Sequence, residues 1–243
     1  HYVASGNLSF ENFPYQAEVT THSANNTVTD SGAAATAMAT GQKVNNDVIS
    51  VALPGDGSEL TTSLELHQAA GKATGLVTTT YVTHATPAAF GAHETSRSNY
   101  SQIADDYLTE TRPNVLFGGS SHMDGAADAG YTVVTDDASM AGLNTETVDM
   151  VSGQFGGGYM PYEYDGLGDL PHLSDMTATA LSVLDNDPDG FFLMVEGGRI
   201  DHASHANDNL RMPGEVVEFS NAVQQVVNWV KWPTAFRREQ LDT

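Results

Sequence analysis

One segment of the chain combines a serine with the expected start of a helix. Thr29-Asp30-Ser31-Gly32 leads into an alanine-rich run, so we expect a helix from Ser31 to Gly41. A helix N-terminus presents unpaired amide groups and a partial positive charge, which stabilise a phosphate or a serine alkoxide. Ser31 is therefore a candidate nucleophile, while Ser31 or Asp30 taken alone also fits an ordinary N-cap.

A second segment carries a histidine, a threonine and an arginine. Thr83-His84-Ala85-Thr86-Pro87 follows a predicted strand, and Arg97 comes ten residues after Pro87. Loops at the carboxyl ends of strands are where α/β sheets bind ligands. An arginine in such a loop can hold a phosphate with two parallel hydrogen bonds. A surface salt bridge is the other interpretation of Arg97.

A third segment follows an apolar run and contains Glu196, Asp201, His202 and His205. If this segment is helical, Asp201 and His205 fall on one face, where a carboxylate and an imidazole can share a zinc ion. An ordinary Asp–His contact also explains the pair. Because a zinc site usually needs at least three protein ligands, a third ligand must come from elsewhere.

The elements that must position these residues alternate along the chain. Short apolar runs predict strands at 75–80, 114–117, 131–135 and 191–195, and helical spacing predicts helices at 62–70, 101–108, 174–184 and 215–230. This alternation predicts an α/β fold with a mainly parallel central sheet flanked by helices on both faces, whether complete or incomplete. The run at 191–195, bounded by glycines, predicts a central strand.

The predicted domain organisation is simple. We expect a single domain over residues 1–230, with a glycine- and tyrosine-rich loop at 144–168 that covers one face. Residues 231–243 hold three of the nine basic residues, which indicates a basic tail of either non-native or natural origin. The chain begins with His1 and shows no signal-peptide pattern, so we expect that something upstream was removed.

Composition excludes several partners and ligand types. The 31 acidic residues against 9 basic ones give a net charge of -22, which repels nucleic acid and anionic membranes and suits a salt-tolerant protein. No run of about 18 apolar residues predicts a membrane span. The absence of cysteine excludes disulfides and thiolate metal sites, so any metal must be held by histidine, carboxylate, hydroxyl or water.

Taken together, the three segments resemble the alkaline phosphatase family in type and order, from about Thr29 to about Val230. The resemblance implies a metal-assisted hydrolase of phosphate monoesters in which Ser31 becomes phosphoserine and Arg97 holds the phosphate oxygens. It implies zinc and magnesium as cofactors and a small-molecule ester as substrate. It also implies a homodimer as one of the assemblies open to the chain, and a periplasmic or secreted location.

The resemblance also assigns metal ligands by position. Thr86 and Glu196 match ligands of the magnesium site, and Asp201 and His205 match two ligands of one zinc. The resemblance places three further residues, His84, His202 and Asp30, beside these sites, where they would contact the metal ligands or reach the metals through water rather than bind the metals directly. One zinc lowers the pKa of the serine hydroxyl, and the other stabilises the departing oxygen.

The sequence departs from the family pattern at both ends of the site. No strand ending in Asp-Gly-Met-Gly or a similar sequence precedes Ser31, and no histidine follows His205. The chain is then either a piece of a longer enzyme or a short relative with altered chemistry. Since each lost ligand weakens metal binding, we expect this chain alone to be a poor zinc phosphatase.

Two other function classes stay open. A serine esterase would use the amide groups beside Ser31 for an oxyanion and a histidine base (His22, His84, His202 or His205), although no Gly-x-Ser-x-Gly motif is present. A non-catalytic remnant would bind magnesium or calcium loosely through its carboxylates. Cleavage of an acyl ester without metal would indicate the esterase, and chelator-sensitive cleavage of a phosphate ester would indicate the phosphatase.

Overall fold

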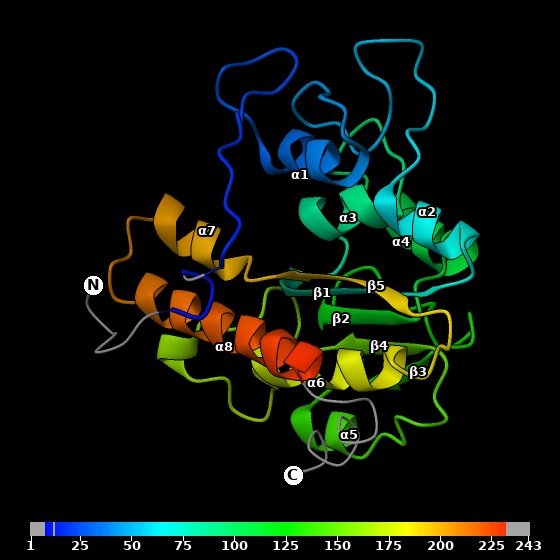
Figure 1. The fold of residues 1–243 in the computed structure, drawn as a ribbon, viewed down its shortest axis with the longest axis vertical. Helices are drawn as coiled ribbons and strands as arrows, with labels where there is room; N and C mark the ends of the chain where they lie inside the picture. Colours follow the sequence, from blue (N-terminus) through cyan, green and yellow to red (C-terminus); the bar gives the residue numbers. More distant parts are fainter. Residues whose placement is uncertain (1–7, 12, 232–243) are drawn as a thin grey trace.

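A five-stranded parallel sheet forms the centre of the molecule. The computed structural model describes residues 8–11 and 13–231, and within them the strand order is β3-β4-β2-β1-β5. The strands are β1 (Ala73–Tyr81), β2 (Val115–Gly119), β3 (Thr132–Val134), β4 (Val151–Gln154) and β5 (Phe191–Glu196). Helices lie on both sides of this sheet (Figure 1), which confirms the predicted fold class.

One group of helices packs on the side of the sheet that faces upwards in Figure 1. They are α1 (Ser31–Thr40), α2 (Ser63–Ala69), α3 (Ala85–Gly91) and α4 (Tyr100–Thr109). The sheet contributes Leu76, Leu116 and Met194 to this side of the core, and they pack with side chains that include Tyr107. Helix α1 packs on α3 as an outer layer, so α3 connects the serine-bearing helix to the end of β1.

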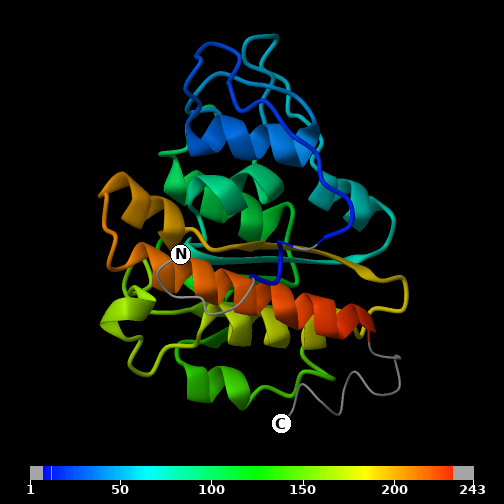
Figure 2. The ribbon, with the colours of Figure 1, turned by 60° about the vertical axis from the view of Figure 1, so that its left-hand side comes forward.

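The opposite side is covered by α5 (Asp137–Ala141), α6 (Leu173–Leu184) and α8 (Met212–Lys231). Helix α6 packs on the sheet and α8 packs on α6, as the turned view in Figure 2 shows. Val77, Val115 and Phe117 point to this side. Strands β1 and β2 are buried on both faces, so their residues do not alternate between buried and exposed positions.

Strands β1 and β5 carry the candidate site residues to the same end of the sheet, the one at which the strands have their carboxyl ends. Strand β1 leads through Tyr81 to His84 and α3, and β5 leads through Glu196 to the short helix α7 (Arg199–His205). The two strands are in parallel register, with Thr78 opposite Glu196. Parallel strands end at one edge, so the second and third sequence segments meet there.

The segment 144–168 corrects one expectation. It was predicted as a covering loop, but it contains β4, which lies inside the sheet between β3 and β2, and the 3₁₀ helix η1 (Glu163–Asp165). Strand β4 has the sequence Val-Ser-Gly-Gln, which carries no apolar run. A Cβ at Gly153 would overlap the ring of Phe155, so close packing requires glycine at this position. The same glycine interrupts the apolar pattern, which is why the strand was not predicted from the sequence.

Strand β5 was predicted to be central, but among the described residues it lies at one end of the sheet, beside β1. Helices α3 and α5 were not predicted. Helix α8 ends at Lys231, and the rest of the predicted basic tail lies outside the described residues, while the single-domain boundary stays a prediction. None of the described helices is long and apolar enough to cross a membrane.

Candidate active site

Ser31 is the first residue of α1, and its neighbours explain why the helix starts there. Asp30 is the N-cap in extended backbone, and its Oδ1 accepts a hydrogen bond from the Ala33 amide at 3.0 Å. The helix ends at Gly41, whose left-handed conformation (φ 74°) lets its amide donate to Ala37. Aspartate is among the preferred N-cap residues, so the sequence places Ser31 at the positive end of a ten-residue helix.

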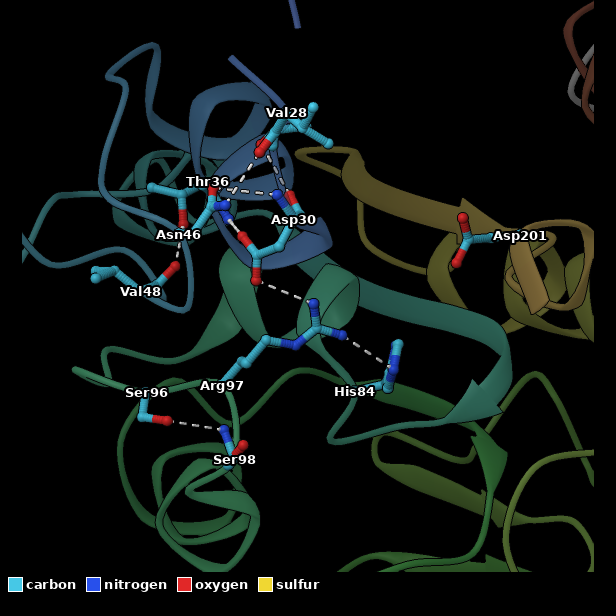
Figure 3. A network of polar contacts seen from close by, with 12 residues as sticks. Val28, Asp30, Thr36, Asn46, Val48, His84, Ser96, Arg97, Ser98 and Asp201 are labelled. Atoms are coloured by element: carbon cyan, nitrogen blue, oxygen red, sulfur yellow. Dashed lines mark hydrogen bonds and ion pairs between the residues drawn. The ribbon is translucent and has the colours of Figure 1, made fainter. Parts of the chain in front are cut away.

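Arg97 connects the serine-bearing helix to His84. Its Nη1 lies 3.0 Å from Asp30 Oδ2, and its Nη2 donates to His84 Nε2 at 3.3 Å (Figure 3). The Arg97 amide also donates to the Asp47 carbonyl at 2.6 Å, which fixes the loop. Burial raises the pKa of Asp30, but hydrogen bonds from Ala33 and Arg97 outweigh burial and hold it below its usual value. Asp30 is therefore ionised and orients the guanidinium.

His84 is a neutral, buried member of this network. Burial, followed by the positive charges of Arg97 and His202, lowers the pKa of His84 to about 3. Its Nε2 accepts from Arg97, so the proton resides on Nδ1, which is buried and has no hydrogen-bond partner in the described part of the chain. No hydrogen bond joins Ser31 to a histidine among the described residues. His84 is therefore placed to position Arg97 rather than to serve as a base for Ser31.

The second group consists of Glu196 and two threonines. Thr78 donates from Oγ1 to Glu196 Oε2 at 2.7 Å, and the Thr86 side chain lies near enough to Glu196 to lower the pKa of its carboxyl. Burial raises the pKa of Glu196 above its usual value even though both threonines lower it. Hydroxyl and carboxylate oxygens are the ligands that magnesium prefers, so the donor types fit that ion. The structure brings the predicted pair Thr86 and Glu196 together, while the sequence analysis missed Thr78.

The third group lies on α7 and is exposed. Asp201 Oδ1 and His205 Nε2 are 3.5 Å apart on one helical face, as predicted, with their side chains 57% and 80% exposed. Carboxylate and imidazole atoms are suitable zinc ligands, and the described residues bring two of them here. The charge of Asp201 raises the pKa of Glu196 and that of Arg97 lowers it, so Glu196 is near enough to both groups to sense their charges.

His202 faces the interior from the same helix. Arg199 donates from Nη1 to His202 Nδ1 at 2.8 Å, and the His202 ring centroid is 5.6 Å from that of His84. The Arg199 guanidinium lies 3.7 Å from the centroid of the Tyr162 ring. Arg199 and the tyrosine rings beside it were not predicted from the sequence, because Tyr159 and Tyr162 belong to the segment that was predicted as a covering loop.

A second cluster of potential metal ligands, two carboxylates and one imidazole, lies outside the predicted site. Glu163, His172 and Glu218 each place one potential ligand atom within 4.8 Å of the others. These groups already accept structural hydrogen bonds, including Ser174 amide to Glu218 at 2.7 Å at the start of α6. A neighbouring cavity of about 370 Å³ is lined by acidic residues, among them Asp136, Asp169 and Asp175, and by His172. Its negative lining disfavours a phosphate, and none of the predicted site residues lines it.

Comparison with known sequences gives one family. A profile described as alkaline phosphatase matches residues 2–123 and 115–234. Alkaline phosphatase 3 of Bacillus subtilis is 44% identical over 218 residues, which cover 84% of this chain and 46% of the relative. The tissue-nonspecific alkaline phosphatase of Gallus gallus is 33% identical, with 89% and 53% coverage. The chain spans about half the length of the curated relatives it matches.

Solved structures give the same result. A cold-active alkaline phosphatase from a psychrophilic Shewanella superposes with a TM-score of 0.81 at 35% identity, covering 87% of this chain and 54% of that protein. The alkaline phosphatase of the Antarctic bacterium TAB5 superposes with a TM-score of 0.83 at 28% identity, with 95% and 69% coverage. A variant of the TAB5 enzyme is described with magnesium bound in its M3 site.

Proposed function

The chain belongs to the alkaline phosphatase family, and we propose that it hydrolyses phosphate monoesters through a phosphoserine intermediate at Ser31. The observation that carries the proposal is the placement of Ser31 at the positive end of α1, next to an ionised Asp30 that orients Arg97. A helix N-terminus and a guanidinium then converge on one phosphoryl group.

The residues of the chain divide the reaction between them. The Ser31 oxygen forms a bond to phosphorus while the bond to the leaving alcohol breaks, and water later displaces the serine to release inorganic phosphate. Arg97 neutralises charge on the phosphoryl oxygens in both steps. Asp30 and His84 hold the two ends of the guanidinium, so Arg97 does not have to be ordered when the substrate binds.

The proposed cofactors are zinc and magnesium, because the side chains present offer the ligand atoms that these ions prefer. Asp201 and His205 would hold zinc, and Thr86 and Glu196 would hold magnesium. When bound, these ions would supply positive charge that makes the serine hydroxyl easier to deprotonate and the alcohol a better leaving group. The carboxylates of Asp201 and Glu196 would therefore serve to retain the ions.

We also propose a periplasmic or secreted location, on the basis of the family membership.

The test compares two serines that each begin a helix. Ser31→Ala should lower hydrolysis of p-nitrophenyl phosphate by about 10³-fold or more, assayed with added zinc and magnesium. Acid-quenched wild-type protein should carry one phosphate group on the peptide that contains Ser31. Ser63→Ala is the matched control, because Ser63 is the first residue of α2 and lies outside the site, so this variant should keep both properties.

Three results would contradict the proposal. Retained turnover in Ser31→Ala, phosphate on a different residue, or no turnover and no phosphoserine in the metal-supplemented wild type would each reject it. Chelator-resistant cleavage of p-nitrophenyl acetate that is lost in Ser31→Ala would indicate the serine esterase instead.

A further inference from the structure

Tyr159 is a surface aromatic side chain that is held on several sides. Its ring stacks on Tyr81 with centroids 4.7 Å apart and planes inclined by 26°, and its hydroxyl donates to the Tyr81 hydroxyl at 3.4 Å. The next residue, Met160, is buried, and its amide donates to the Thr79 carbonyl at 3.2 Å. Even so, Tyr159 is 43% exposed. A rigid, exposed tyrosine offers contact area at a low entropic cost of ordering.

The loop that carries Tyr159 lies directly on the end of β2. A Cβ at Gly119, the last residue of β2, would overlap the carbonyl oxygen of Gly158. Only glycine allows the two main chains to approach this closely. Tyr159 is therefore fixed at the carboxyl edge of the sheet, where α/β proteins bind their ligands.

The rings of the two candidate-site histidines border Tyr159. Its ring centroid is 4.5 Å from that of His202 and 5.9 Å from that of His84. The Arg199 guanidinium, which donates to His202, lies 5.4 Å from the Tyr159 centroid. Tyr159 thus contacts the His84 end of the network, whereas Asp30 lies at the other end. In Figure 3 this network runs from Asp30 through Arg97 to His84, in the direction of α7.

The geometry of phosphoryl transfer decides where the organic part of the substrate extends. The attacking and leaving oxygens lie roughly in line on opposite sides of phosphorus. With Ser31 as the attacking group, the alcohol portion extends away from the start of α1. Beyond Arg97 the network continues to His84, and Tyr159 presents an aromatic ring beside His84 and His202.

We propose that the exposed part of the Tyr159 ring packs edge-on against an aromatic alcohol portion of the substrate, so that the protein selects aryl phosphate monoesters over alkyl ones. This inference rests on the proposed function, because it needs the phosphate at Ser31 and Arg97. Contact of one aromatic pair should favour the aryl ligand by about two- to tenfold in affinity.

Binding of two non-hydrolysable ligands tests the inference without requiring turnover. Phenylphosphonate and methylphosphonate are titrated calorimetrically against the whole chain in the presence of zinc and magnesium salts. The wild type should bind phenylphosphonate two- to tenfold more tightly. Tyr159→Ala should bring that ratio to about one by weakening only phenylphosphonate, and Tyr159→Phe should keep the ratio because it keeps the ring. Tyr164→Ala is the control, because Tyr164 is exposed on η1 and its change should leave the ratio intact.

The outcomes separate the two proposals. Equal affinity of the wild type for both ligands, or an unchanged ratio in Tyr159→Ala, would overturn the role of Tyr159 and leave the phosphate site standing. Failure of both phosphonates to bind the wild type would overturn the phosphate site, and the inference with it. If Tyr159→Ala does not fold by circular dichroism, Tyr159→Leu, which keeps apolar bulk without a ring, should lose the preference, and its retention would overturn the inference.

Discussion

The two sides of the candidate site differ in how firmly this chain fixes them. On the Ser31 side, Asp30, Arg97 and a buried His84 hold one another through contacts of 3.0 and 3.3 Å. On the α7 side, Asp201 and His205 meet at 3.5 Å with most of their side chains in solvent. One side is therefore ordered by internal hydrogen bonds, whereas the other presents ligand atoms that nothing else in the described residues immobilises.

The difference follows from what each kind of binding requires. A phosphate site needs a helix N-terminus and a positioned arginine, and a short stretch of sequence supplies both. A zinc site needs three or more ligands, which normally come from separate segments, and the described residues bring two to α7. Single substitutions on the Ser31 side should accordingly change turnover and stability. Substitutions on the α7 side should mainly change the affinity for metal.

After the loss of Ser31 itself, the largest effect is expected from the loss of Arg97. Arg97→Ala should lower turnover of p-nitrophenyl phosphate and affinity for methylphosphonate by about 10²- to 10³-fold, because one preorganised charged donor is removed. Arg97→Lys should recover little, since an ammonium cannot reach Asp30 and His84 together. Arg211→Ala is the control, and an equal loss there would mean that overall charge, rather than the position of Arg97, controls phosphate binding.

The next prediction concerns the pH dependence of the free energy of unfolding, which we expect Glu215 on α8 to influence. Glu215 is buried on α8, and its Oε1 accepts from the Glu163 amide at 2.8 Å. Burial, together with the charge of Glu163, raises its pKa to about 7, although Arg199 opposes the shift. The folded state then binds more protons than the unfolded state between about pH 4.5 and 7. Stability is highest below this window and falls by up to about 3 kcal/mol as the pH rises through it.

Urea unfolding at pH 5 and pH 8 measures this effect. Glu215→Gln should be less dependent on pH than the wild type, while Glu146→Gln, an exposed control, should follow the wild type. Other carboxyls with raised pKa values, such as Asp106 and Asp175, contribute in both proteins, so the difference between variants isolates Glu215. An identical pH slope in Glu215→Gln would show that this carboxyl does not titrate in the window.

Zinc affinity gives a smaller and more local effect. His205→Ala should weaken zinc binding by at least about tenfold, measured by competition with a chromogenic chelator. Because His205 is 80% exposed, the free energy of unfolding without metal should change by less than about 0.5 kcal/mol. His22→Ala removes an exposed histidine elsewhere and should leave zinc affinity unchanged. Equal weakening in both variants would show that zinc binds non-specifically to this acidic chain.

The sequence predicted the parts of the molecule whose signals are local. The alanine-rich start of α1 and the apolar runs of β1, β2 and β5 gave the parallel α/β fold, because buried parallel strands are continuous in hydrophobicity. Strand β4 escaped prediction because its polar, glycine-containing sequence is buried only through its neighbours. The position of β5 at one end of the sheet could not be read from its composition, which matches that of a central strand.

The same division applies to the site. The pairing of Asp201 with His205 follows from helical spacing, and the N-cap role of Asp30 follows from local chemistry. The contacts of Arg97 with Asp30 and of Thr78 with Glu196 join distant segments, so only the fold shows them. Tyr159 was overlooked because residues 144–168 were predicted only as a glycine- and tyrosine-rich covering loop, whereas the close approach of Gly158 to Gly119 fixes this part of the loop on the sheet.

The smallest expected effect compares one substitution on the two sides of the site. Asp30→Ala removes an N-cap and the partner of Arg97, so it should lower the free energy of unfolding by about 0.5–2 kcal/mol. Asp201→Ala removes an exposed carboxylate whose described contact is a 3.5 Å approach to His205, and it should change stability by less than about 0.5 kcal/mol. Chemical denaturation of both variants without metal gives the two values. A larger loss in Asp201→Ala would mean that α7 depends on its acidic side chain for structure, and the contrast between an ordered and an open side would then be wrong.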